Sequence, residues 1–419
     1  MSRTTQGVAS LSRPTRRQVL RVVGLAPIVW AAGPASRLQA AEPIKIGTLL
    51  DLTGALEAYG LPIQRGATLA MEQINAAGGP LGRPLLLVHR DSQTDPTAGI
   101  DAAKKLLELD KVVAIVGALS SGVTIPVATS VTIPAGIVQI SPASTSPQMT
   151  DLQDQDWLFR TCPSDALQGK VSGRLARTLG WQTVATVFVN NPYGSGLTRT
   201  FSQTFTAHGG QVTAMVPYEE GRPSYRGEIE QALKGKPQAL VLFSYPENGV
   251  TIMRQALELG FRGKFLLADG MKAQEVVQNV GLQYVQGTYG TTAGARESRA
   301  KTRFIEAYLQ RFGDRPPKPY IDTCYDAVAL LALAIQQAGS SVPKAIREAL
   351  RQVANPPGEE IEPGEFHKAF MLLSQGTKVQ YRGASGEVDL DPQGDVVSPI
   401  EIWKISDNGS IVTERLEDV

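Results

Sequence analysis

The chain has few of the residues that metal sites and catalytic centres use most. It contains two cysteines and three histidines among 419 residues. His89, His208 and His367 stand far apart without the spacing of metal ligands, so we expect no metal site. Cys162 and Cys324 are distant in the sequence, and we expect two separate buried thiols. A disulfide between them is the alternative, because an exported protein can form one if the Cα atoms come close enough.

Recognised catalytic and nucleotide-binding motifs are also missing. The sequence holds no P-loop and no Gly-x-Ser-x-Gly nucleophile elbow. Residues 194–199, Gly-Ser-Gly-Leu-Thr-Arg, follow a predicted strand, but Arg199 stands where a dinucleotide-binding fingerprint needs its third glycine. The segment is therefore expected to open a helix, with Tyr193 pointing into a cleft. We expect no enzymatic activity and no cofactor, and an enzyme is only a distant alternative.

No segment is long and apolar enough to span a bilayer, and the basic N-terminus has another explanation. The first 41 residues contain six arginines and no acidic residue, and Arg16-Arg17 precedes a short apolar stretch from Val22 to Ala32. This pattern is typical of a twin-arginine export signal cleaved near Ala40-Ala41. No cysteine lies near that point to carry a lipid anchor, so we expect a soluble periplasmic protein. A basic amphipathic start to a cytosolic protein is the alternative.

Removing the signal changes the charge balance of the chain. Without those six arginines, 35 of the 41 basic residues remain against 40 acidic ones, which leaves a net charge of about −5. A net negative charge disfavours nucleic acid and anionic membranes as partners. The 378 residues after position 41 exceed one typical core and predict two domains.

Strands and helices alternate along most of the mature chain. Such alternation predicts parallel sheets wound on both faces by helices. The alternation is interrupted near 157–162, which we interpret as an extended linker, and again near 285–292. Three helices, expected at 299–312, 320–338 and 342–353, follow the second break with hardly a strand among them, so we expect them to cover the first series.

The predicted fold class is therefore α/β, with two similar doubly wound lobes joined by a hinge of more than one crossing. Ligands of open α/β sheets bind beyond the carboxyl ends of the strands, so the cleft between the lobes is the expected site. The expected boundaries are 1–41 for the signal, 42–161 plus 286–382 for the N-terminal lobe, and 162–285 plus 383–419 for the C-terminal lobe.

Two hydroxyl-rich turns directly follow short apolar runs. Val112 to Val116 leads into Gly-Ala-Leu-Ser-Ser-Gly at 117–122, and Gly136 to Ile140 leads into Ser-Pro-Ala-Ser-Thr-Ser at 141–146. The runs are typical of buried parallel strands. The turns offer backbone N–H and hydroxyl donors, which bind a carboxylate or a phosphate without a charged side chain. We therefore expect one anion-binding crevice at these turns.

Aromatic residues and one acid follow other predicted strands. Tyr59 follows the first strand of the mature chain, whereas Tyr193, Tyr245 and Asp269 follow strands of the second series. Aromatic walls and a carboxylate suit a small molecule that carries an amine. Asp269 precedes a glycine, so capping of a turn is an equal alternative for it.

At these residues the chain resembles the branched-chain amino-acid binding proteins, the periplasmic substrate-capturing subunits of ABC importers. The similarity runs through nearly the whole mature chain. The segments that carry it are Ile44 to Gly47, Leu52 to Gly54, Tyr59-Gly60, Ile74 to Gly79, Asp91 to Pro96, the Ser121 turn, Ser141 to Thr145, Tyr193 to Gly196, Tyr325 to Ala327, and Gly394-Asp395.

The resemblance implies the type I periplasmic binding protein fold and a set of ligand contacts. The ligand carboxylate would lie at Ser121 and at Ala143, Ser144 and Thr145, with Ser121 and Thr145 donating hydrogen bonds. Asp269 would hold the α-ammonium. Tyr59, Tyr193 and Tyr320 would wall the side-chain pocket, and one further tyrosine position of the family falls on either Ser244 or Tyr245, of which we predict Tyr245.

Departures from the family pattern leave the ligand open. An aspartate, Asp269, stands where the family usually has the longer glutamate, and Ser92 and Ser120 occupy the region of a small disulfide loop seen in some members. Family members also bind aromatic acids, short amides and urea. We expect a monomer that closes on a small amino acid or a related acid and is then recognised by an inner-membrane ABC permease. A ligand-sensing regulatory module of the same fold is the alternative.

Overall fold

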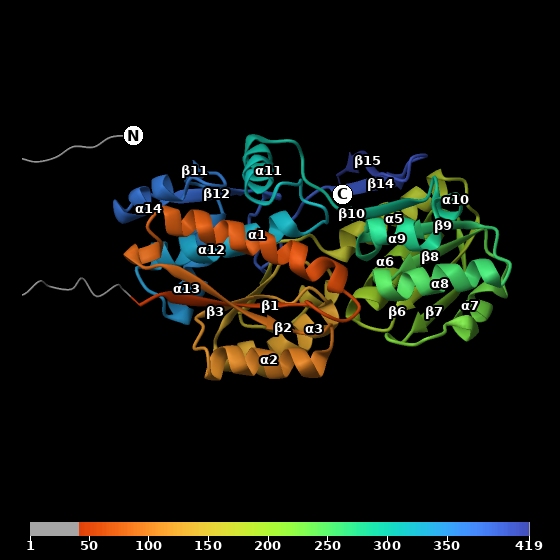
Figure 1. Cartoon of the computed structure of the whole chain (residues 1–419), viewed down its shortest axis with the longest axis horizontal. Helices are drawn as coiled ribbons and strands as arrows, with labels where there is room; N and C mark the ends of the chain where they lie inside the picture. The colour runs from red at the N-terminus through yellow and green to blue at the C-terminus, as the bar shows by residue number, and fades with distance from the viewer. Residues whose placement is uncertain (1–41, 419) are drawn as a thin grey trace, which may run out of the picture. The chain divides into compact units, whose positions relative to one another are not determined.

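The computed structural model describes residues 42–418. The predicted export signal, with its cleavage site near Ala40-Ala41, lies outside the described residues. The strands of residues 42–418 form a five-stranded, a seven-stranded and a three-stranded sheet. The two larger sheets are each flanked by helices, which confirms the α/β class (Figure 1).

The five-stranded sheet is entirely parallel and is built from the first part of the described chain. The apolar runs before the two hydroxyl-rich turns form its centre, since all four residues of β3 and all four of β4 are buried. In spatial order its strands are β2 (Leu85–Asp91), β1 (Ile44–Leu50), β3 (Ala114–Gly117), β4 (Val138–Ser141) and β5 (Leu158–Arg160).

The seven-stranded sheet repeats this order in its parallel part and adds two antiparallel strands at one edge. In spatial order its strands are β15 (Ile411–Glu417), β14 (Ile400–Ile405), β10 (Tyr289–Ala293), β9 (Lys264–Leu267), β8 (Ala239–Phe243), β6 (Thr183–Val189) and β7 (Gln211–Tyr218). The small sheet consists of β11 (Glu359–Ile361), β12 (Val379–Gly383) and β13 (Gly386–Glu387).

Helices cover both faces of the two larger sheets. Those packed with the five-stranded sheet and the small sheet are α1 (Glu57–Ala76), α2 (Pro96–Glu108), α3 (Ser121–Val127), α4 (Ile133–Ala135), α11 (Arg299–Phe312), α12 (Ile321–Ala338), α13 (Pro343–Ala354) and α14 (Phe366–Ser374). Those packed with the seven-stranded sheet are α5 (Asp165–Thr178), α6 (Pro192–Ala207), α7 (Arg226–Leu233), α8 (Pro246–Glu258), α9 (Gln274–Val280) and α10 (Leu282–Val285). Short helical turns are η1 (Pro80–Gly82), η2 (Ala128–Thr132), η3 (Pro147–Met149) and η4 (Asp269–Met271).

Alternation along β1 divides the core of the first lobe between two faces. Ile46 and Leu50 pack in the large cluster that includes α1 and α12, whereas Leu49 packs with α2 and α3 on the other face. Figure 1 shows α1 and α12 on one side of this sheet and α2 on the other. The packing agrees with the prediction that α11, α12 and α13 return to the first lobe, because α11 packs on α1, α12 on α1, β3 and β4, and α13 on β4.

Two expectations about boundaries are wrong. The expected linker at 157–162 contains β5, which pairs in parallel with β4. The expected N-terminal lobe from 286 wrongly includes β10, which pairs with β9 and β14 of the seven-stranded sheet. The other lobe boundaries stay predictions.

Within the described residues, the chain passes three times between the seven-stranded sheet and the part of the molecule that holds the five-stranded and three-stranded sheets. The three connecting segments follow β5, follow β10, and join β13 to β14. We call them the crossing segments. They agree with the predicted hinge of more than one crossing. Within residues 42–418, no helix has both the length and the apolar composition needed to cross a membrane.

Candidate functional site

Both larger sheets have the strand order 2-1-3-4-5 in their parallel part, and this order positions the site. In such sheets the chain leaves neighbouring strands in opposite directions at one switch point, where loops open a crevice. The switch points lie between β1 and β3 in one sheet and between β6 and β8 in the other. The segments after these four strands carry the predicted residues: Tyr59, Ser121 and Tyr193 lie in the first turns of α1, α3 and α6, and Tyr245 directly precedes α8.

A cavity lies where the two switch points meet, and it is lined by residues from both sheets. Its volume is about 30 Å³, close to the space of a single water molecule. Seven of the nine predicted site residues line it, and Ser144 and Thr145 do not. The lining residues are Leu56, Tyr59, Ile63, Leu119, Ser121, Ala143, Tyr193, Tyr245, Asp269, Gly270 and Tyr320.

Asp269 is the charged group of this cavity, and hydrogen bonds hold both of its carboxylate oxygens. Oδ1 accepts from Gln168 Nε2 at 2.8 Å and from the Tyr193 hydroxyl at 2.9 Å. Oδ2 accepts from the Tyr320 hydroxyl at 2.9 Å. Burial raises the pKa of Asp269, while these hydrogen bonds oppose that rise. The carboxylate therefore lies in the wall of the cavity and makes no capping bond to the turn that follows it.

The tyrosines form rigid walls around Asp269. Tyr193 and Tyr245 stack with ring centroids 5.6 Å apart and planes 11° from parallel. Burial and the charge of Asp269 raise the pKa of Tyr193 and Tyr320 well above the usual value, so both hydroxyls keep their protons. Tyr245 lies in the cavity, whereas the hydroxyl of Ser244 bonds to Tyr218, so the structure favours Tyr245 over Ser244.

Direct contacts join the two sides of the cavity. The Tyr59 hydroxyl donates to the backbone carbonyl of Asp269 at 2.9 Å, and the Ser120 and Tyr245 hydroxyls are 3.1 Å apart. The Ser146 hydroxyl donates to the Pro192 carbonyl at 2.9 Å. The cleft is therefore closed, and a solute larger than water can enter only if the two sides separate.

The sequence profile of the periplasmic binding protein family matches residues 43–362. The chain belongs to the periplasmic binding protein family.

The sequences of named relatives match this chain over most of their length. This binding protein is 31% identical to the leucine-, isoleucine-, valine-, threonine- and alanine-binding protein of Pseudomonas aeruginosa, over 76% of this chain and 85% of the relative. It is 28% identical to the chemotactic signal transduction system substrate-binding protein BasB of Halobacterium salinarum, over 96% of this chain and 97% of the relative. The crystal structure of the leucine-binding protein LivK from Thermotoga maritima superposes with a TM-score of 0.76 at 27% identity, covering 90% of this chain and 99% of that one. The fold is therefore the type I periplasmic binding protein fold.

The two hydroxyl-rich turns of the binding protein lie side by side, because β3 pairs with β4. Ser121 lines the cavity, and its hydroxyl accepts a bond from the Ser146 N–H at 3.2 Å, which leaves its proton free for a ligand. Ser144 does not line the cavity and instead links the two turns to each other, since its hydroxyl donates to the Leu119 carbonyl at 2.9 Å. Contact between Ser144 and a ligand stays a prediction.

Thr145 also has a partner away from the cavity. Its hydroxyl donates to Asp165 Oδ2 at 2.8 Å, and the Asp165 N–H donates to the Thr145 carbonyl at 2.7 Å. In this closed arrangement the Thr145 hydroxyl therefore donates its hydrogen bond to Asp165 and not toward the cavity. Contact between Thr145 and a ligand stays a prediction.

Sequence reasoning missed Gln168 and Gly270. Gln168 donates to Asp269 from the first turn of α5, and a polar residue there is hard to distinguish from a solvated one. A Cβ atom on Gly270 would lie 2.5 Å from the Ser244 carbonyl oxygen and 3.3 Å from the Tyr193 hydroxyl. Only glycine lets the chain pass this close to the cavity.

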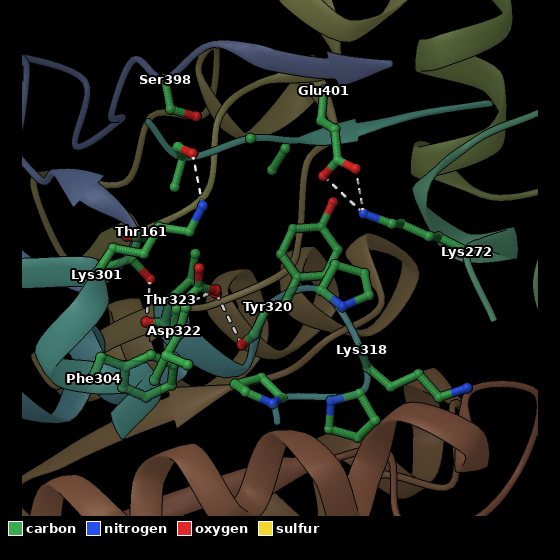
Figure 2. A pocket seen from close by; sticks show the side chains of 18 of the residues that line it. Thr161, Lys272, Lys301, Phe304, Lys318, Tyr320, Asp322, Thr323, Ser398 and Glu401 are labelled. Atoms are coloured by element: carbon green, nitrogen blue, oxygen red, sulfur yellow. Dashed lines mark hydrogen bonds and ion pairs between the residues drawn. The ribbon is translucent and has the colours of Figure 1, made fainter. Parts of the chain in front are cut away.

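A larger cavity of about 490 Å³ lies among the crossing segments, and Tyr320 lines it as well as the smaller one (Figure 2). Its lysines already have partners in the protein. Lys272 Nζ is 2.7 Å from both oxygens of Glu401, and Lys301 Nζ donates to the Ala295 carbonyl at 3.0 Å. Among residues 42–418, no group of three His, Cys, Asp or Glu side chains could hold a metal ion.

Proposed function

We propose that this protein captures a small amino acid by closing its two lobes around it. The single observation that supports this most is the polarity of the cavity. The carboxylate of Asp269 lies in one wall, and the hydroxyl of Ser121 and the Ala143 turn lie in the other. An α-amino acid has the matching pair of groups, since its ammonium suits Asp269 and its carboxylate suits hydroxyl and N–H donors.

The side chain of the ligand would contact aromatic and aliphatic groups. Tyr59, Tyr193, Tyr245 and Tyr320 surround the cavity, with Leu56, Ile63 and Leu119 beside them. Such walls suit an apolar side chain, and the names of the relatives point to leucine, isoleucine, valine, threonine and alanine. Asp269 disfavours an anion without an ammonium, so aromatic acids rank second, and short amides and urea, which are neutral, are screened with them.

The wider role follows from closure. A closed, loaded form differs from the open form on its surface, and an ABC permease in the inner membrane can recognise that difference. We propose an exported, monomeric periplasmic protein that delivers its ligand to such a permease. The similarity to BasB over 96% of this chain favours a second role, delivery of the ligand signal to a chemotaxis system. A membrane partner co-purified with the loaded protein would distinguish the two roles.

Calorimetric titration tests the ligand directly. A thermal-shift screen over amino acids, aromatic acids and amides first selects the ligand, because binding to the folded state raises the melting temperature. Asp269→Asn should then weaken an amino-acid ligand by more than about tenfold, or 1.4 kcal/mol. The control is Asp314→Asn, a half-exposed acid 3.7 Å from Arg65, which should bind as the wild type does. Unchanged affinity in Asp269→Asn would remove this residue from the site.

A further inference from the structure

We propose that Asp165 holds a proton while the site is free of ligand and releases it when the ammonium group of a ligand binds Asp269. Asp165 is then a positioning residue that acts through Asp269 and couples ligand affinity to pH. The inference rests on the proposed function, because it needs a ligand with an ammonium group. It adds a second carboxylate, a proton and a pH dependence that the proposed function does not contain.

The start of α5 carries both Asp165 and Gln168, and Gln168 contacts Asp269. Ser164 caps the helix, and Asp165 is its first residue. Gln168 follows three positions later on the same face of the helix, and its Nε2 donates to Asp269 Oδ1 at 2.8 Å. Asp165 is 0% exposed and Asp269 is 4% exposed, so water screens neither charge from the other.

The two carboxylates differ in the number of donors that they receive. Asp269 accepts three hydrogen bonds, from Gln168, Tyr193 and Tyr320. Asp165 accepts one side-chain bond, from Thr145 to Oδ2 at 2.8 Å, and its buried Oδ1 has no partner among residues 42–418. A buried ionised carboxylate needs donors, so the proton is more stable on Asp165. Burial and the charge of Asp269 raise the pKa of Asp165 well above its usual range.

The charges around Asp165 are too few to stabilise both carboxylates as anions. The one cation that lowers the pKa of Asp165 is Arg160 on β5, and its guanidinium is already paired with Asp395. The other titratable groups that face Asp165 are neutral, because burial raises the pKa of each of them; they are Cys162, Tyr193 and Tyr320.

Ligand binding then exchanges one positive charge for another. Before binding, one proton on Asp165 leaves a single uncompensated negative charge on Asp269. After binding, the ammonium supplies the positive charge, Asp165 ionises, and its proton passes to solvent. The two carboxylates and the ammonium together carry one negative charge in both states, and the ligand's own carboxylate is bound on the other wall by the Ser121 hydroxyl and the Ala143 turn. Without this release, the ligand ammonium would face one anionic carboxylate, Asp269, and one neutral carboxyl group, Asp165.

Titration calorimetry of the wild type with L-leucine is the first test. Titrations in two buffers of different ionisation enthalpy give the number of protons released per ligand. We expect close to one proton at a pH between the pKa of Asp165 in the loaded protein and its higher pKa in the ligand-free protein, and a Kd that falls about tenfold per pH unit in this range and levels off above it. With 4-methylpentanoate, which is leucine without its ammonium group, we expect no release.

Asp165→Asn is the second test, because asparagine keeps the shape and removes the titration. This variant should bind L-leucine without proton release and with a Kd independent of pH. The matched control is Asp322→Asn. Asp322 is another acid whose pKa burial raises, but it is coupled to Lys301 and Lys272, so this variant should keep the release.

The outcomes separate this inference from the proposed function. If no amino acid binds the wild type, the proposed function fails. If L-leucine binds without proton release between about pH 4 and pH 9, the inference fails and the proposed function stands. If Asp165→Asn weakens binding equally at every pH and keeps the release, Asp165 is only structural and the inference fails. If this variant does not fold, the proton count of the wild type decides.

Discussion

The hydroxyl of Tyr59 donates a hydrogen bond to the backbone carbonyl of Asp269 at 2.9 Å, across a sequence separation of 210 residues. This bond joins the first turn of α1 to the turn after β9. It therefore links the two sides of the cleft at the residue that we propose to hold the ligand's ammonium group. One contact thus joins the two sides of the cleft and holds the backbone that carries the Asp269 carboxylate.

Tyr59→Phe should weaken ligand binding without unfolding the protein. The ring stays in the wall, and only the bond that forms on closure is lost. A buried hydrogen bond contributes about 1 kcal/mol, so we expect a Kd about fivefold to tenfold higher by calorimetry. Tyr284→Phe removes a hydroxyl from a side chain that is 53% exposed and should leave the Kd unchanged. An unchanged Kd in Tyr59→Phe would show that this bond does not contribute to closure.

Gly270→Ala should disturb the site through a steric conflict and not through a change of polarity. The new Cβ would lie 2.5 Å from the Ser244 carbonyl oxygen, so the backbone must shift and Tyr193 with it. We expect an affinity loss of more than about tenfold and a lower melting temperature. Gly227→Ala on α7 meets nothing within 4 Å and should be neutral or slightly stabilising. Equal effects of the two substitutions would contradict the tight approach at Gly270.

Arg160→Met should be strongly destabilising, because it breaks a buried ion pair with Asp395. Arg160 is 0% exposed and also donates to the Ser146 carbonyl at 3.0 Å. Removing one partner leaves the other charge buried and unpaired, at a cost of about 3–5 kcal/mol in the free energy of unfolding. Arg226→Met breaks the exposed pair with Glu258 and should cost less than about 1 kcal/mol. Urea unfolding of both variants measures the difference.

The pH dependence of stability should carry the signature of Asp51. Burial raises the pKa of Asp51 to about 6, above the value of an unfolded chain. The folded state therefore binds the Asp51 proton more tightly than the unfolded chain does. The resulting contribution to the free energy of unfolding is fully present below about pH 4 and is lost as the pH rises through about 6. The loss amounts to up to about 3 kcal/mol. Urea unfolding across this range should show a smaller fall with pH for Asp51→Asn than for the wild type. Parallel curves would contradict the assignment.

The sequence predicts the features that depend on the repeating order of strands and helices. Two series of strands and helices indicate two lobes, and the residues after each strand identify the cleft. Tyr193 and Asp269 are found this way because each directly follows a buried apolar run, and the carboxyl ends of parallel strands meet at one edge. The return of α12 to the first lobe follows from the lack of strands near it.

The remaining features depend on contacts that no local pattern encodes. β10 belongs to the seven-stranded sheet because of antiparallel pairing with β14, which begins more than a hundred residues later. Thr145 has the expected position, but its hydroxyl is taken by Asp165 from another element. Gln168 contributes to the site only because the start of α5 faces Asp269. In each case the partner is distant in sequence and is fixed by packing between elements.

The crossing segments constrain how the lobes can move. A single linking strand would let one lobe swivel around it as well as tilt. Three segments line the 490 Å³ cavity together, and we expect such a connection to bend more easily than it twists. Closure would then bring Tyr59 back to the same carbonyl and Ser120 to the same tyrosine. The three crossing segments would therefore keep the two sides of the site aligned whenever the lobes close.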